Sequence, residues 1–268
     1  MSTFDDDPAK AQRAIQSVEV GGRLLLTLAA HNSPMTLKDL AAHANLAPSR
    51  AHPYLVSYGR LGLVAQDPTS GRYALGPAAL QLGLTALHQF DPLRAAQPVA
   101  EELANETGQA VAVAVWGNLG ATVIRMIDAR QPLHVAMRAG TVMSPFGTAT
   151  GRAFAAVLHA ERIAGALAGN ALGDGQSGAR TAAADLQPQL VSARDEFASH
   201  GCCRAVGTPI PGVNAFSAPV FDHDGEPILV ITLLGHQDNV PSAWSSPMAA
   251  AVKRAAADVS ARLGYRPR

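Results

Sequence analysis

The chain has 268 residues, of which 48% are hydrophobic and 16% charged, so it can bury a substantial core and is not an intrinsically disordered protein. Its formal net charge is zero, and charge alone therefore gives no support for a nucleic-acid partner. The charge is unevenly placed, because residues 8–76 hold seven Lys and Arg against three acidic residues, a net charge of +4, whereas residues 77–268 have a net charge of −1.

The start of the chain and its cysteines bear on where the protein works. The first ten residues, MSTFDDDPAK, are acidic and lack an apolar run, so residues 1–13 are expected to be a disordered leader and not a signal peptide. The longest apolar runs, such as Val111–Trp116, are far too short to span a bilayer. Cys202 and Cys203 are adjacent, a placement that strains a disulfide between them. We therefore expect a cytoplasmic protein without a membrane partner.

Residues 14–76 have the pattern of three helices followed by a hairpin. Thr36 is a helix-capping residue, Asn45 suits the turn that ends the second helix, and Pro48 suits the first turn of the third. Gly21-Gly22 in the first helix is expected to let a neighbouring helix approach closely. The predicted elements are helices at 15–30, 37–44 and 48–61 and strands at 63–66 and 72–75. Two short helices, a tight turn and a basic hairpin outline a winged helix-turn-helix, which reads DNA.

Basic residues and small hydroxyls mark the third helix as the element that contacts DNA, because they suit phosphates and guanine edges. The candidate contacts are Lys38, Ser49, Arg50, His52, Ser57 and, in the wing, Arg72. The alternative is a solvated face on an ordinary helical hairpin. Pro53 conflicts with the assignment, because inside a helix it would remove one hydrogen bond and crowd the carbonyl of Ser49. Either the helix starts later than Pro48, or it bends at Pro53.

A linker helix is predicted at 77–90, directly after the boundary at Gly76. Its Leu80, Leu84 and Leu87 form an apolar stripe that the linker itself does not cover. An uncovered stripe of this kind favours association with a second chain, so we expect dimerisation here.

Residues 91–268 predict an α+β domain with a central antiparallel sheet and helices on its faces. The expected helices are 93–107 (interrupted by Pro98), 152–158, 160–167, 184–199 and 247–263, and the expected strands are 110–116, 122–127, 133–137, 215–221 and 227–234. The small-residue loop Phe146–Gly151 precedes the helix that starts at Arg152. Its free backbone N–H groups suit a carboxylate.

Motifs for catalysis and metal binding are weak. The chain has no GxSxG, HExxH or CxxC motif and no GxxxxGK[ST] loop. His200, Cys202, Cys203 and His223 have an unusual spacing for metal ligands, and only Arg204 is placed to lower the pKa of a thiol. An enzyme acting on a small acid with an accessory helix-turn-helix head, and a thiol or metal sensor, are the minority alternatives. No cofactor and no metal are expected.

The chain resembles the IclR family of bacterial transcriptional regulators over nearly its whole length. LKDLAAHANLAPSRAHPYLVSYGRLGLV is similar to the family's winged helix-turn-helix, and GRYALGPAALQLG to its passage from wing to linker. SPFGTATGRAFAA is similar to a loop-to-helix signature, and FSAPVFDHDGEPILVITLLG to the C-terminal pair of strands. The segments occur in the family's order and spacing, so the match is specific as a set.

The resemblance implies a GAF-like effector-binding domain, a homodimer or dimer of dimers, double-stranded operator DNA as the partner, and no catalysis. Family members bind small metabolites, often organic or aromatic acids, and thereby change operator occupancy. The implied domains are a leader at 1–13, a DNA-binding domain at 14–76, a linker at 77–90 and an effector-binding domain at 91–268. The candidate effector contacts are Val135, Arg138, Met143, Phe146, Ala149, Thr150, Ala205, Val213, Ala215, Thr232 and Leu234.

The chain departs from the family pattern in its pocket. Ala205, Ala215 and Leu234 stand where members with small oxo-acid ligands have acidic, thiol and hydroxyl groups. Fewer polar partners favour a larger, more apolar acid, such as an aromatic one. Its carboxylate would meet the N–H groups at Ala149 and Thr150, with a nearby arginine such as Arg138 or Arg125 as a further partner.

The recognition helix departs from the pattern as well. Pro53 stands where many members have an arginine. An arginine there can make a contact worth on the order of 1–3 kcal/mol. Its loss places the contact on Arg50, His52 and Ser57, or weakens binding.

Overall fold

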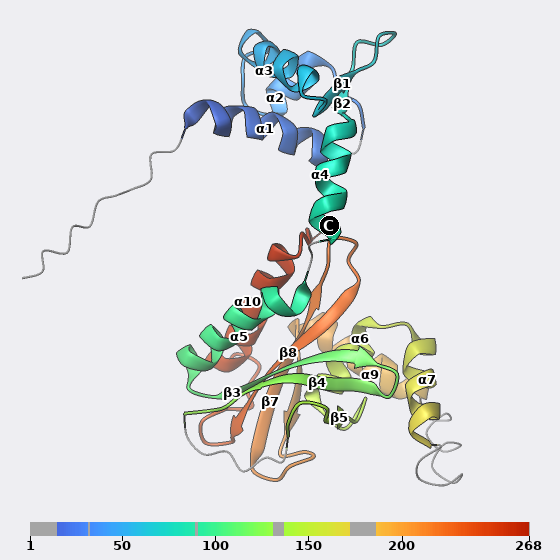
Figure 1. Cartoon of the computed structure of the whole chain (residues 1–268). Coiled ribbons are helices and arrows are strands. Elements are labelled where there is room, and N and C mark those ends of the chain that lie inside the picture. Colours follow the sequence, from blue (N-terminus) through green and yellow to red (C-terminus); the bar gives the residue numbers. More distant parts are fainter. Residues whose placement is uncertain (1–14, 32, 89–90, 131–136, 172–185, 268) are drawn as a thin grey trace, which may run out of the picture. The chain divides into compact units, whose positions relative to one another are not determined.

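The computed structural model describes residues 15–31, 33–88, 91–130, 137–171 and 186–267, and these fall into two compact units, Met1–Phe90 and Asp91–Arg268 (Figure 1). The predicted leader, residues 1–13, lies outside the described residues, as does nearly all of the predicted strand at 133–137. No helix in the described part of the chain combines the length and the apolar character needed to cross a membrane.

The first unit packs three helices around one core and closes them with a two-stranded hairpin. Its elements are α1 (Gln16–Ala30), α2 (Leu37–His43), α3 (Pro48–Arg60), β1 (Val64–Gln66), β2 (Tyr73–Leu75) and α4 (Pro77–His88). Leu24, Leu40 and Leu55, one from each of the first three helices, meet in a buried cluster. The hairpin is antiparallel, with Ala65 opposite Ala74. These elements confirm the predicted winged helix-turn-helix.

Local signals explain where these helices end and how closely they pack. Thr36 Oγ1 accepts a hydrogen bond from Asp39 N at 3.2 Å and so caps α2. Asn45 follows α2 in the left-handed region, with a φ of 55°. Gly21 lets α1 approach α3, because a Cβ at this position would overlap the hydroxyl of Tyr58. The predicted close approach at the glycine pair is thus confirmed for Gly21.

Helix α3 runs without a break from Pro48 to Arg60 and contains Pro53. A later start of this helix, one of the two explanations for Pro53, is therefore wrong. Ala51 and Leu55 are buried in the core of the unit on either side of the proline. Their packing outweighs the local penalty of a helical proline, which is about 3 kcal/mol.

Helix α4 keeps its apolar side chains in solvent within its own unit. Leu80 and Leu84 of the predicted stripe are 65% and 47% exposed, and Leu82 is 64% exposed. The side chain of Leu87, the third member of the predicted stripe, lies outside the described residues.

The second unit is built on a six-stranded antiparallel sheet with the strand order β5-β4-β3-β8-β7-β6 (Figure 1). The strands are β3 (Ala110–Gly117), β4 (Gly120–Ile127), β5 (Val142–Met143), β6 (Cys203–Val206), β7 (Val213–Phe221) and β8 (Pro227–His236). The register places Thr232 of β8 opposite Ala112 of β3 on one side and opposite Ser217 of β7 on the other. The predicted α+β fold with a central antiparallel sheet is confirmed.

Two pairs of helices cover the sheet. They are α5 (Pro92–Thr107) with α10 (Pro247–Arg262), and α6 (Ala149–Val157) with α9 (Leu186–His200), while α7 (Ala160–Ala171) packs beside β4. Thr232 faces α6, because its hydroxyl is hydrogen-bonded to that of Thr150. Leu229, Ile231 and Leu233 alternate with Thr232 along β8, so they face the other pair, and all three are buried.

Several expectations for the second unit need correction. Helix α6 begins at Ala149 and not at Arg152, because the side chain of Thr148 caps it. Helix α5 passes through Pro98 without interruption. The sequence does not predict β5 and β6, which have two and four residues and therefore show little alternation of polar and apolar side chains.

Candidate functional site

The predicted DNA contacts are all exposed on the first unit. They are Lys38 of α2, then Ser49, Arg50, His52 and Ser57 of α3, and Arg72 beside β2. The buried residues Ala51 and Leu55 define the inner side of α3. Helical spacing therefore turns Ser49, Arg50 and Ser57 outward, and Pro53 lies among them. One exposed helix face thus carries the groups that suit phosphates and base edges.

The wing uses some of its polar groups within the fold. Arg72 Nη1 donates to the carbonyl of Pro34 at 3.1 Å. At the tip, Asp67 Oδ1 accepts from Thr69 N and Asp67 Oδ2 accepts from Ser70 Oγ, both at 2.8 Å. The Thr69 amide and then the Ser70 hydroxyl hold the pKa of Asp67 below its usual value. One guanidinium nitrogen of Arg72 is therefore already used within the fold.

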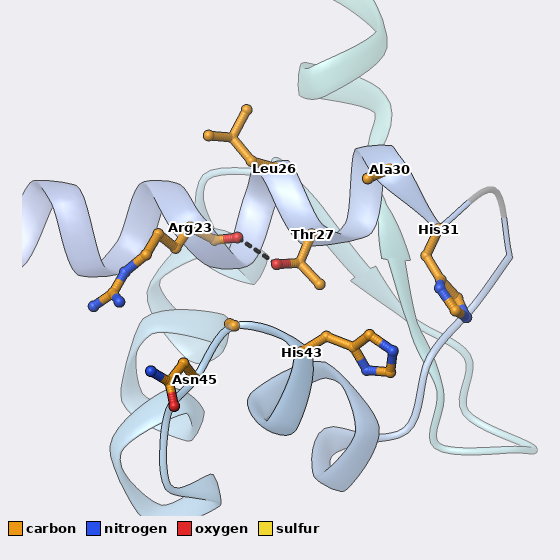
Figure 2. Close-up of a pocket in the computed structure, with 8 residues that line it drawn as sticks. Arg23, Leu26, Thr27, Ala30, His31, His43 and Asn45 are labelled. Carbon is orange, nitrogen blue, oxygen red and sulfur yellow. Dashed lines mark hydrogen bonds between the residues drawn. The ribbon is translucent and has the colours of Figure 1, made fainter. Parts of the chain in front are cut away.

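A separate hollow in the first unit lies between α1 and the turn that follows α2 (Figure 2). It is lined by Arg23, Leu26, Thr27, Ala30, His31, His43, Ala44 and Asn45. The imidazole rings of His31 and His43 have centroids 5.3 Å apart. The hollow is distinct from the predicted DNA-contact face, because none of the six predicted contacts lines it.

A cavity in the second unit brings together eight of the eleven predicted effector contacts. They are Met143, Ala149, Thr150, Ala205, Val213, Ala215, Thr232 and Leu234. Of the other three, Val135 lies outside the described residues, Arg138 is exposed and does not line the cavity, and Phe146 lines a neighbouring cleft.

Neither arginine considered as a carboxylate partner lines the cavity. Arg138 lies in a turn, where its N–H donates to Thr141 Oγ1 at 3.1 Å, and its side chain is exposed. Arg125 lies 3.9 Å from a carboxylate oxygen of Glu101. Among the described residues that line the cavity, none is charged.

Five lining residues are not predicted by the sequence: Met137, Thr148, Thr208, Pro209 and Ile210. Three of them belong to the loop between β6 and β7. This loop is bounded by Gly207 and Gly212, which have positive φ values of 59° and 77°. Such a loop has no periodic pattern that reveals which side chains point inward, and its glycines and prolines signal only that the chain turns here.

Three of the four threonines that line the cavity, Thr148, Thr150 and Thr232, gather at the start of α6, while Thr208 lies in the loop between β6 and β7. Thr148 Oγ1 accepts from Gly151 N at 3.0 Å and donates to the carbonyl of Ser144 at 2.9 Å. Glycine is required at 151, because a Cβ there would overlap the Ser144 carbonyl oxygen. Ala149 and Thr150 are the first two residues of α6, so their N–H groups have no acceptor within the helix. The partial positive charge of a helix start favours an anion at this position.

Apart from Thr208, the rest of the lining is apolar, and the cavity is small. It offers ≈ 50 Å³ to the centres of water-sized molecules, which is room for roughly three or four waters. An apolar cavity that holds benzene has a volume of about 150 Å³. A ligand with an aromatic ring therefore requires side chains to move, and the flexible thioethers of Met137 and Met143 line this part.

The neighbouring cleft, which Phe146 lines, holds a cross-link between three elements. Arg152 of α6 donates from Nη1 to the carbonyl of Arg204 on β6 at 3.1 Å. Its Nη2 forms an ion pair with the largely buried carboxylate of Glu196 on α9. The amide of Arg204 donates to the same carboxylate at 3.0 Å. Arg152 thus ties α6 to both α9 and β6.

The two cysteines do not form a reactive thiol site. Both are buried, and burial raises the pKa of Cys203 to about 12 and also raises the pKa of Cys202. A redox-sensing cysteine needs an exposed thiolate, so the thiol-sensor alternative is not supported.

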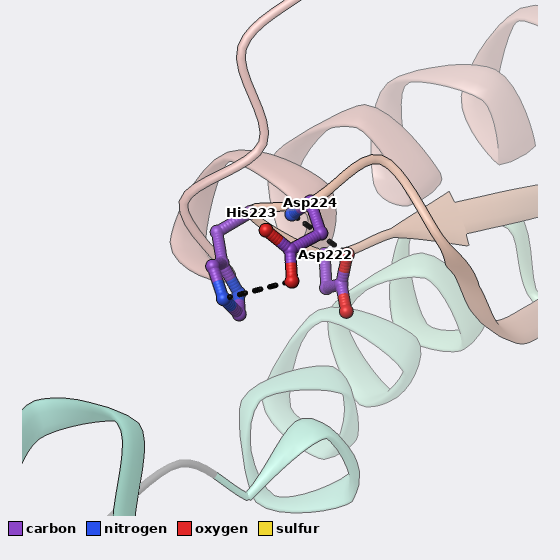
Figure 3. Close-up of side chains that lie close together, drawn as sticks. All are labelled: Asp222, His223 and Asp224. Carbon is purple, nitrogen blue, oxygen red and sulfur yellow. Dashed lines mark hydrogen bonds and ion pairs between the residues drawn. The ribbon is translucent and has the colours of Figure 1, made fainter. Parts of the chain in front are cut away.

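The metal-sensor alternative is not supported either. The ring of His200 stacks on Trp244, with centroids 4.0 Å apart. Within the described ranges, the residues close enough to share an ion are Asp222, His223 and Asp224, at the turn between β7 and β8 (Figure 3). Asp222 Oδ1 accepts from the amides of Asp224 and Glu226, each at 2.9 Å, and so shapes that turn.

Comparison with known proteins places both units in one family. Residues 17–68 match the IclR helix-turn-helix domain, and residues 84–261 match the C-terminal domain of the bacterial transcriptional regulator IclR. The chain is 30% identical over 261 residues to the glycerol operon regulatory protein of Streptomyces griseus, and the alignment covers 94% of this chain and 98% of that protein. It is 24% identical to the transcriptional repressor IclR of Escherichia coli, and this alignment covers 96% of this chain and 93% of that protein.

A solved structure extends the likeness to three dimensions. The crystal structure of HmgR from Pseudomonas aeruginosa has a TM-score of 0.84 and 30% sequence identity, and it covers 95% of this chain and 100% of that one. The relatives whose names state a function are regulators, so the enzyme alternative is wrong. The fold of both units and these matches show that the chain belongs to the IclR family of bacterial transcriptional regulators.

Proposed function

We propose that the effector of this regulator is an organic acid with an apolar, aromatic body, bound in the cavity between α6 and the sheet. The observation that carries the proposal is the division of the cavity into two parts. Free helix N–H groups and the hydroxyls of Thr148, Thr150 and Thr232 gather at one end, and the rest is apolar except for Thr208, with no charged residue among the described lining. Such a site satisfies a carboxylate at one end and an uncharged body at the other.

The apolar part of the cavity disfavours a compact, strongly hydrated acid. Ala205, Ala215 and Leu234 offer no side-chain hydrogen bond to a second polar group. A polar group that loses water without gaining a partner costs about 1–3 kcal/mol. An aromatic body has no such group to satisfy, and Met137 and Met143 can move to admit it.

The first unit, which reads DNA and is therefore the reading unit of the protein, supplies the response to the effector. Lys38, Ser49, Arg50, His52, Ser57 and Arg72 contact operator DNA. The exposed leucines of α4 pack against a second copy of the chain, because an isolated helix with these side chains in solvent buries too little apolar surface. Effector binding shifts the population between arrangements of the two DNA-binding heads, and so changes operator occupancy.

The effector is tested by calorimetric titration of the purified protein. The titrants are benzoate, glyoxylate, pyruvate and glycerol, the last because a 30% identical relative is named as a glycerol operon regulator. We expect benzoate to bind, and the variant Ala215→Leu to lose this binding because the added side chain fills the cavity. Tight binding of glyoxylate, pyruvate or glycerol without binding of benzoate would contradict the proposal.

The assembly is tested by light scattering on the double variant Leu80→Glu/Leu84→Glu. We expect the charges to prevent burial of α4 and to lower the molar mass in solution. Val191→Glu, a change at another exposed apolar residue, serves as the control and should leave the molar mass unchanged.

A further inference from the structure

Three buried hydroxyls form a chain that starts at the cavity and ends behind its wall. Thr150 Oγ1 and Thr232 Oγ1 are 2.8 Å apart, and Thr232 Oγ1 and Ser217 Oγ are 2.7 Å apart. Thr150 and Thr232 line the cavity, whereas Ser217 does not. The exposed fractions are 2% for Thr150, 3% for Thr232 and 0% for Ser217. These hydrogen bonds therefore connect the fully buried Ser217 to the polar end of the cavity.

The protons of these three hydroxyls can be arranged in only a few ways. Each hydroxyl donates one hydrogen bond and can accept two. If Ser217 donates to Thr232, the bond between Thr232 and Thr150 can run in either direction, and the leftover proton lies on Thr150 or on Thr232. If Thr232 donates to Ser217, the proton of Ser217 is left over.

The surroundings of Ser217 choose between these arrangements. Within the described residues, Ser217 Oγ has Thr232 as its hydrogen-bond partner and no other. A leftover proton on Ser217 would be a buried donor without an acceptor, which is unfavourable. A leftover proton on Thr150 or Thr232 opens on the cavity, because both residues line it, and a ligand or water can accept it.

We infer that Ser217 donates to Thr232 and thereby makes the polar end of the cavity a set of hydrogen-bond donors. These donors are the leftover hydroxyl proton of Thr150 or Thr232 and the N–H groups of Ala149 and Thr150. The inference rests on the proposed function and deepens it, because it names the group that the site selects. A carboxylate accepts from all of these donors, whereas the NH₂ group of an amide would face them with donors of its own.

Ser217 is accordingly a positioning residue that sets selectivity without touching the ligand. In Ser217→Ala, Thr232 Oγ1 no longer accepts a hydrogen bond from Ser217, so one of its lone pairs becomes free. The cavity then offers an additional acceptor to an amide and a less ordered donor to an acid. The affinity for an acid relative to its amide is the quantity that reports this change.

The experiment compares the dissociation constants of benzoate and benzamide for the full-length protein and its variants. We expect the preference for benzoate to fall by about tenfold in Ser217→Ala. Ser260→Ala is the control, because Ser260 is an equally buried hydroxyl in α10 that bonds to the Ala256 carbonyl and the Phe221 amide. Its preference for benzoate should equal that of the wild-type protein.

A second pair of variants keeps the inference open to refutation if Ser217→Ala does not fold. Thr232→Val removes the middle hydroxyl and should lower the preference for benzoate, while Thr232→Ser retains it. An unchanged preference in Ser217→Ala and Thr232→Val, with benzoate still bound, overturns the inference and leaves the proposed function standing. Binding of neither compound by the wild-type protein refutes both.

Discussion

The two units present their chemistry in opposite ways. In the first unit, the predicted DNA contacts are exposed side chains on one helix and a hairpin, and the core beneath them is made by other residues. In the second unit, Ala149, Thr150, Thr232 and Leu234 line the cavity and are themselves buried among the core elements. A predicted DNA contact can therefore be changed without altering the packing of the core, whereas a change to a cavity residue also changes the packing around it.

The largest expected effect is on the reactivity of the Cys203 thiol, which tests how well the second unit keeps this residue from solvent. Because burial raises the pKa of Cys203 from 9.0 to about 12, its thiolate at pH 8 should be roughly a thousandfold scarcer than in an unfolded chain. In a Cys202→Ala background, iodoacetamide labelling followed by mass spectrometry should therefore be slower by at least this factor in the native protein than in urea. Equal rates in both conditions would show that the unit opens readily.

The same thiol gives a pH dependence with a defined sign. Below pH 9.0 the thiol is protonated in both the folded and the unfolded state, so its contribution to stability is fully present. As the pH rises from 9.0 to about 12, the unfolded thiol ionises and the folded one does not. The free energy of unfolding should therefore fall over this range, and Cys203→Ala should make the fall shallower in urea titrations.

A glycine at the cavity provides the next effect. In Gly151→Ala the new Cβ would lie 2.6 Å from Pro145 Cα and would overlap the Ser144 carbonyl oxygen, both of which are backbone atoms. We expect a loss of about 3 kcal/mol in the free energy of unfolding and loss of benzoate binding. Gly165→Ala is the matched control, because this exposed helical glycine has open space around it and the change should stabilise the protein by up to about 1 kcal/mol.

A predicted DNA contact on the exposed face of α3 should affect binding without affecting stability. Arg50→Ala should weaken binding to an operator fragment, selected from random-sequence DNA by the protein itself, by about tenfold. The free energy of unfolding should be nearly unchanged, because Arg50 is exposed. Fluorescence anisotropy at several salt concentrations measures the effect, and Arg262→Ala on α10 is the control. A large loss of stability in Arg50→Ala would break the contrast between the units.

The smallest effect tests packing within the reading unit. In Gly21→Ala the new Cβ would overlap the hydroxyl of Tyr58, which is the end of a side chain and can move. We expect a cost of about 1 kcal/mol, less than for Gly151→Ala. Gly22→Ala, with open space around it in the same helix, should be neutral or stabilising. A cost for Gly21→Ala as large as that for Gly151→Ala would remove the distinction between a side-chain and a backbone obstacle.

The reading unit could be predicted well from the sequence because its signals are local. The cap at Thr36, the turn at Asn45 and the apolar spacing of α3 each act within a few residues. Pro53 gave the wrong warning about where α3 starts, since the sequence shows the local penalty of a proline but not the packing of Ala51 and Leu55 that outweighs it.

The cavity could be predicted only in part. Resemblance to a known family supplied positions on strands and on α6, such as Thr150 and Thr232, and these do line one cavity. The loop residues Thr208–Ile210 had no periodic pattern, and β6 was too short to recognise. Ser217 was not predicted as a site residue, because its proposed role depends on a hydrogen bond between two strands, which no spacing in the sequence reveals.

The cross-link made by Arg152 has a mechanical consequence. Its guanidinium joins α6 to Glu196 of α9 and to the Arg204 carbonyl of β6, only one turn from the helix start that faces the cavity. We therefore expect a displacement of Ala149 and Thr150 to be passed on to α9 and to the edge strand β6, because both are joined to α6 through this one guanidinium.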